Sequence, residues 1–102
     1  MNLEDAPPLP ALADQAARRA RRLRLLEEQR AYARLLVTDI RLYHEEAVIL
    51  GRLERDLAER LAKPLETARG RYRQRFSAEQ DARIFEDEVV HILAAGEAGR
   101  LG

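Results

Sequence analysis

Glu88 and His91 carry the pair of side chains in this sequence that is best suited to chemistry. Their spacing on a helix places a carboxylate and an imidazole one turn apart on the same face. Such a pair can ligate iron or manganese. Val89 and Ile92 mark the expected inward face, so Glu88 and His91 are expected to flank the edge of the core. A solvated helix surface is the competing interpretation.

This Glu-x-x-His motif resembles that of the ferritin-like carboxylate proteins, in particular the short encapsulated type in which two-helix chains dimerise to complete a di-iron site. The resemblance implies a further carboxylate from an earlier helix, which Glu45 or Glu46 would supply here, with His44 nearby. The sequence departs from that family through Pro64, an additional helix and the lack of a second motif. A ferritin-like metal-binding protein is therefore an alternative function, and outside it the sequence predicts no cofactor.

A cluster of arginines is the second candidate site. Its members are Arg18, Arg19, Arg21, Arg22 and Arg24. Clustered guanidinium groups can neutralise the phosphates of DNA or RNA, which makes a small nucleic-acid-binding protein another alternative. On a helix, however, these five side chains point all round the axis, and no aromatic residue lies between them for base stacking. Contact with an acidic partner and simple solvation are the competing interpretations, and nucleic-acid binding is not the favoured one.

The formal charges cancel over the whole chain but are unevenly spread. Between residues 18 and 34, seven arginines and two glutamates give a local charge of +5. Between residues 79 and 97, six acidic residues and one arginine give a local charge of −5. Segments of opposite charge can pair between subunits and fix the register of assembly.

Several classes of function lack their usual residues. There is no cysteine, which excludes disulfides and thiolate sites and fits a cytoplasmic location. The single serine, Ser77, is better placed as a helix cap than as a nucleophile, and there is no glycine-rich phosphate loop. The longest apolar runs are four residues, against roughly 20 for a membrane span. A classical enzyme and a membrane protein are both disfavoured.

The elements that position these residues are expected to be helices. Residues 1–10 are rich in proline and predict a flexible tail, followed by a single helical domain over residues 11–96. The first helix is expected at about 14–50, with Asp14 as N-cap and Gly51 as its end. Its apolar residues recur in heptads, with Gln29 as a polar exception. The expected oligomer interface consists of Leu26, Ala33, Leu36, Ile40, Tyr43, Ala47 and Leu50.

Two shorter helices are expected after Gly51. One spans about 56–76, begins at Asp56 and is kinked at Pro64. Its predicted inward face is Leu57, Leu61, Leu65, Ala68, Tyr72 and Phe76. The other spans about 78–95, with a capping box at Ser77 and Gln80 and an end at Gly96. Its predicted inward face is Ala82, Phe85, Val89 and Ile92, and residues 97–102 are expected to be flexible.

The lengths of these helices suggest an assembly. The first should run about 55 Å and the other two roughly 30 Å each, so two short helices cannot cover the long one from a single position. Either the first helix bends near its arginine-rich third, or a second copy covers its seam, and sustained heptads favour the second copy. We therefore expect an all-α, coiled-coil-like bundle completed by homo-oligomerisation. Its expected function is that of a non-enzymatic structural or adaptor protein that binds itself and another protein.

Overall fold

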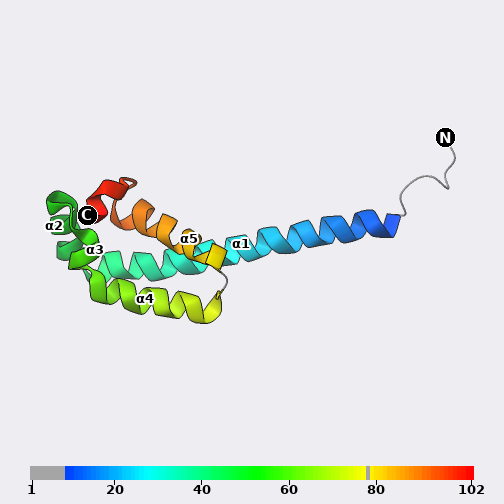
Figure 1. Cartoon of the computed structure of the whole chain (residues 1–102), viewed down its shortest axis with the longest axis horizontal. Helices are drawn as coiled ribbons and strands as arrows, with labels where there is room; N and C mark the ends of the chain where they lie inside the picture. Colours follow the sequence, from blue (N-terminus) through cyan, green and yellow to red (C-terminus); the bar gives the residue numbers. More distant parts are fainter. Residues whose placement is uncertain (1–8, 78) are drawn as a thin grey trace.

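The structure, a computed structural model, describes residues 9–77 and 79–102. In chain order its elements are α1 (Leu9–Tyr43), α2 (Glu45–Glu54), α3 (Leu57–Arg60), α4 (Ala62–Arg75), α5 (Glu79–Glu88), the π-helical turn η2 (Val89–Leu93) and the 3-10 turn η3 (Ala98–Leu101) (Figure 1). No strand occurs among the described residues, and the chain is all-α with a long N-terminal helix, as the sequence predicts.

Helix α1 is the axis of the molecule. The α4 helix runs back alongside the C-terminal half of α1, and α5 then runs beside that half in the same direction as α1 (Figure 1). The N-terminal half of α1 extends beyond them, so the molecule measures 68 Å by 25 Å by 21 Å (Figure 1). Its radius of gyration is 19.7 Å, whereas a compact chain of about 100 residues has a value near 13 Å. The fold is thus a small three-helix body with a projecting helix.

The first helix differs from the expected one at both ends. It begins at Leu9 and includes Pro10, because proline in a first turn lacks only an N–H that has no helical partner. Residues 9–10 therefore do not belong to the expected tail, whose residues 1–8 lie outside the described part, and Asp14 is not an N-cap. The helix also bends, although at His44 (φ −127°, ψ 41°) and not in its arginine-rich third.

Gly51 does not end this helical stretch. It lies inside α2, which stops at Arg55, where the backbone is left-handed (φ 56°). A Cβ atom at residue 51 would lie 2.6 Å from Leu57 Cδ2 and 3.3 Å from Leu57 Cα. Glycine is required here because α2 and α3 approach too closely for any side chain, a constraint that the sequence pattern does not distinguish from a helix end.

The second predicted helix is divided into α3 and α4. The break lies at Leu61, three residues before Pro64, so that Pro64 falls in the first turn of α4. In a continuous helix the proline ring would clash with the carbonyl of Arg60, and the break removes this clash. All six residues of the predicted inward face are buried, at 8% exposure or less: Leu57, Leu61, Leu65, Ala68, Tyr72 and Phe76.

The third predicted helix corresponds to α5 followed by η2. Phe85, Val89 and Ile92 are buried as predicted, but Ala82 is exposed and Asp81 is buried in its place. The carbonyl of Asp81 accepts a hydrogen bond of 2.8 Å from the hydroxyl of Tyr72, which draws this turn toward the core. Residue 78, between Ser77 and Gln80 of the expected capping box, lies outside the described part.

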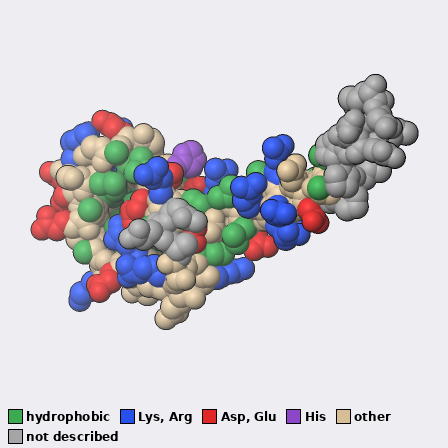
Figure 2. Space-filling model, turned by 45° about the vertical axis from the view of Figure 1, so that its right-hand side comes forward, with side chains coloured by type: hydrophobic (Ala, Val, Ile, Leu, Met, Phe, Trp, Pro, Cys, Tyr) green, Lys and Arg blue, Asp and Glu red, His purple; other side chains and the backbone are tan. Residues whose placement is uncertain are grey.

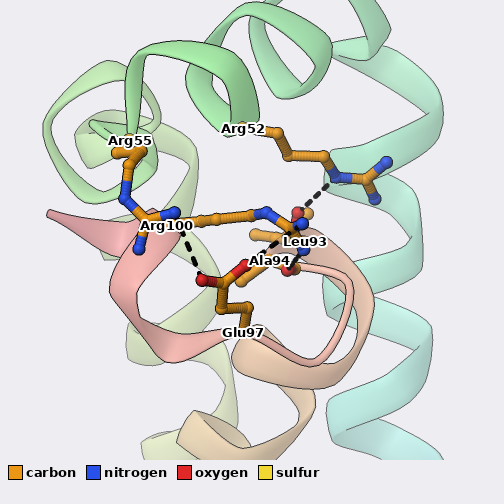
Figure 3. A network of polar contacts seen from close by, with 6 residues as sticks. All are labelled: Arg52, Arg55, Leu93, Ala94, Glu97 and Arg100. Atoms are coloured by element: carbon orange, nitrogen blue, oxygen red, sulfur yellow. Dashed lines mark hydrogen bonds and ion pairs between the residues drawn. The ribbon is translucent and has the colours of Figure 1, made fainter.

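The C-terminus is docked, in contrast to the flexible end expected over residues 97–102. Leu101 packs against the core, and Arg100 donates a 2.8 Å hydrogen bond to the carbonyl of Ala94 (Figure 3). Glu97 accepts a hydrogen bond from Arg55 at 3.3 Å and forms an ion pair with Arg100 at 3.1 Å. These contacts hold η3 against α2 and α3.

Arg52 of α2 caps the end of η2. Its Nε donates to the carbonyl of Leu93 at 2.7 Å, and a terminal nitrogen donates to that of Ile92 at 2.9 Å. The last carbonyls of a helix have no partner within it, so a guanidinium fork satisfies two of them at once. The three polar anchors Arg52, Arg55 and Arg100 thereby join the segment after the bend to the end of the chain (Figure 3).

We predict opposite effects of alanine at two glycines. Gly51→Ala should destabilise the fold by about 1–3 kcal/mol, because Leu57 must move. Gly70→Ala should stabilise it by about 0.5–1 kcal/mol, since nothing lies within 4 Å of its Cβ position inside α4. Urea unfolding followed by circular dichroism measures both changes. Equal effects of the two substitutions would contradict the close approach of α2 and α3.

Candidate functional site

The seven residues of the expected oligomer interface are distributed over two environments. Ala33, Leu36 and Ile40 are buried, at 0%, 8% and 5% exposure, within the core that α1 forms with α4 and α5 of the same chain. Ala47 is half-buried, and the other three, Leu26, Tyr43 and Leu50, are exposed. Much of the seam is therefore filled within one chain. A second copy could therefore cover only a face of α1 that α4 and α5 leave exposed.

An apolar stripe continues from this core onto the projecting half of α1. At heptad spacing, Ala33, Val37 and Ile40 are preceded by Leu26, Leu23, Ala16 and Leu12, with Arg30 and Arg19 as polar interruptions. Leu12, Leu23 and Leu26 are 48%, 55% and 40% exposed. We name Leu12, Ala16, Leu23 and Leu26 the tip stripe. Beyond the body, no described element covers it (Figure 1).

Tyr32 marks the place where the body ends. Its ring stacks on Tyr72, with centroids 6.4 Å apart, and meets the edge of Phe76 at 6.2 Å. Arg75 lies over the Tyr32 ring at 4.8 Å from its centroid. N-terminal to these contacts, Gln29 is the last buried residue of α1. The tip stripe thus begins one turn beyond the aromatic cluster.

Four of the five clustered arginines lie beside or within the tip stripe, and Arg21 lies on the opposite side of α1. At about 100° per residue, Arg18 and Arg22 lie on one flank of it, Arg24 lies on the other, and Arg19 lies within it. All five arginines are exposed, and no ion pair among the described residues includes them. Basic side chains and apolar ones accordingly alternate along the projecting part in Figure 2. A partner that covers the stripe therefore has to carry groups that compensate positive charge on both of its flanks.

Three carboxylates of the acidic segment at residues 79–97, those of Glu86, Glu88 and Glu97, form ion pairs within the chain, whereas Asp87 is exposed and forms none with described residues. Glu86 accepts two hydrogen bonds from Arg69, at 2.6 and 3.1 Å, and Glu97 pairs with Arg55 and Arg100. These contacts compete with the expected pairing between this segment and the arginines of a neighbouring copy. The structure thus favours a source of negative charge outside this segment.

The possible metal ligands are not brought together within one chain. Glu88 is buried, with one carboxylate oxygen 3.5 Å from a terminal nitrogen of Arg34 and the other without a hydrogen-bond partner. His91, Glu45 and Glu46 are exposed. Among the described residues, no three His, Asp or Glu side chains are grouped to hold a metal ion. Asp39 and His44 are exposed as well.

The shifted pKa values have structural causes. Hydrogen bonding to Asp56 raises the pKa of Arg60, and hydrogen bonding to Glu86 raises that of Arg69. Burial raises the pKa of Tyr72 to about 12, with a smaller contribution from the nearby Asp81. Each of these groups holds two elements or two turns together.

Tyr72 predicts a specific alkaline instability. Its folded pKa, about 12, lies above the ordinary value near 10, so its contribution is complete below pH 10 and is lost as the pH rises toward 12. Tyr72→Phe should cost about 1 kcal/mol at pH 8 through the lost bond to Asp81, but should flatten the decline between pH 10 and 12. Urea unfolding at pH 8, 10 and 11.5 measures both. If the free energy of unfolding declines equally with pH in the two proteins, the alkaline instability does not come from Tyr72.

The described helices are too short or too polar to cross a bilayer. Comparison with known proteins gives no match for this chain, either to a family model, to a curated protein or to a solved structure. Its function is accordingly argued from its own surfaces.

Proposed function

We propose that this protein is a non-enzymatic helical adaptor, which self-associates and binds another protein through the tip stripe of α1. The observation that carries the proposal is that an apolar stripe, buried in the body by α4 and α5, continues uncovered along the projecting helix. The lack of cysteine fits a cytoplasmic location, which we propose with it. The ferritin-like alternative has no comparable support.

The energetics of the projecting helix favour a protein partner. An isolated helix of this length is marginally stable in water, and most helical stability in proteins comes from packing of an apolar face. Burying a leucine side chain contributes about 1.5–3 kcal/mol, and the tip stripe exposes three leucines. A partner helix that covers Leu12, Leu23 and Leu26 would therefore stabilise the projecting helix and also gain the free energy of burying these leucines.

The flanking arginines define the chemistry of that partner. Arg18 and Arg22 on one flank and Arg24 on the other would be desolvated or screened by any helix that covers the stripe. Glutamates or aspartates at the corresponding positions of the partner compensate for this, whereas lysines or arginines do not. The proposed partner is an amphipathic helix with leucine and alanine on one face and acidic residues at its edges.

A pair of synthetic peptides tests this proposal. Both are amphipathic helices of about 21 residues with a leucine seam, one with glutamate and the other with lysine at the flanking positions. We expect the glutamate peptide to bind at least tenfold more tightly in calorimetric titrations, and added salt to weaken its binding. Leu23→Glu should abolish binding, and Leu53→Glu, at an exposed position of α2, should leave it unchanged. Equal affinity of the two peptides would exclude the proposed partner chemistry.

Nucleic-acid binding is the second candidate function, because the five clustered arginines are exposed and make no ion pair with described residues. If all five neutralise phosphates, affinity for duplex DNA should fall about 500-fold from 50 to 200 mM salt, with a log–log slope near −4.5. Replacing Arg18 and Arg22 with glutamine should reduce this slope by about 2, and Arg73→Gln on α4 is the control. Fluorescence anisotropy with a labelled duplex measures the slopes. No binding at micromolar protein in low salt would exclude this candidate.

A further inference from the structure

The face of α1 that points away from the core carries a second apolar seam. Leu35 and Leu42 lie seven residues apart and are 58% and 65% exposed. Thr38 lies between them and Ala31 precedes Leu35 by four residues, so the four residues follow one another at steps of four, three and four. We name this set the outer seam. It is distinct from the tip stripe, because it lies opposite the buried face of the body.

The charges beside the outer seam are arranged asymmetrically. Arg34 and Arg41 occupy one flank, and Asp39 occupies the other. The Arg34 side chain is 62% exposed and has only a 3.5 Å contact with Glu88. Asp39 is exposed and has no ion pair among the described residues. Both flanks therefore have charge available to a second helix.

The two possible orientations of a self-pair use these charges differently. In a parallel pair the opposite flanks of the two helices meet, so Arg34 of one copy faces Asp39 of the other, and the symmetry produces this contact twice. In an antiparallel pair like flanks meet, so Arg34 of one copy approaches Arg41 of the other. Charge complementarity thus favours the parallel orientation.

Both ends of the outer seam are sharply limited. Towards the N-terminus the next seam positions are Glu28, Arg24 and Arg21, whose charges do not pack in a helix interface. Towards the C-terminus the bend at His44 ends the straight helix. The seam is therefore about 18 Å long, which suits a weak, concentration-dependent pair rather than an obligate dimer.

We infer that two copies of this chain pair in parallel through Ala31, Leu35, Thr38 and Leu42, with Arg34 facing Asp39 of the other copy. This inference rests on the self-association in the proposed function and gives it a surface and an orientation. The charged positions at Arg21 and Arg24 keep the two projecting helices apart. Each copy therefore keeps its own tip stripe open to a partner.

Cysteine cross-linking tests the orientation directly, because the native chain contains no cysteine. In a parallel pair each seam residue faces the same residue of the other chain. Leu35→Cys and Leu42→Cys should therefore each give disulfide-linked dimers on mild oxidation. Glu66→Cys, exposed on α4, controls for random collision. Cross-linking of only one of these variants, or only of the two mixed together, indicates an antiparallel pair and overturns the inference.

Sedimentation velocity supplies the second measurement. The wild-type protein should shift from about 12 kDa toward twice that mass as its concentration rises from about 5 to 200 µM, and Leu35→Glu should remain monomeric with an unchanged circular dichroism spectrum. Asp39→Arg should weaken the pair at least several-fold. A wild-type monomer throughout this range overturns the inference. Peptide binding at the tip stripe should persist in Leu35→Glu, so the two proposals can fail separately.

Discussion

The body of this protein depends on the burial of one short stretch of α1. Ala33, Val37 and Ile40 contact α4 and α5 from one helix face, and the aromatic cluster of Tyr32, Tyr72 and Phe76 closes the end of this contact. Because apolar burial is the main favourable term in folding, the short helices have a stable position only beside this stretch. The polar anchors at Arg52, Arg55 and Arg100 then fix the C-terminus against the segment after the bend. N-terminal to Gln29, no described side chain of α1 is buried.

The helical class and much of the core could be predicted from the sequence, because both follow from local periodicity. The face from Leu57 to Phe76 is buried at every predicted position, since an amphipathic helix has only one face to bury. The boundaries of the helices were harder to predict from the sequence. Glycine is typical both of a helix end and of a close contact between helices, and at Gly51 only the short distance to Leu57 distinguishes the two. The bend at His44 could not be predicted, because no glycine or proline lies next to it in the sequence.

The function-bearing surfaces were harder to predict, because heptad spacing does not say which helix fills a seam. The pattern through Ala33, Leu36 and Ile40 suits a partner chain as well as it suits α4 and α5, which follow it in the same chain. The exposed outer seam at Leu35 and Leu42 is visible only once the buried face is known. In the same way, the acidic segment looked free in the sequence, and contacts such as that between Glu86 and Arg69 became apparent only from the structure.

The separation between body and projecting helix has a consequence for how such a protein can change over time. Beyond Gln29, no described side chain of the projecting helix is buried, so substitutions there do not disturb the packing that keeps the body folded. Body residues such as Leu57 or Phe85 have no such latitude, because replacing them opens a cavity. Substitutions can therefore change the surface of the projecting helix, residue by residue, without passing through unfolded intermediates. The surface of the projecting helix and the foldability of the body can thus evolve independently.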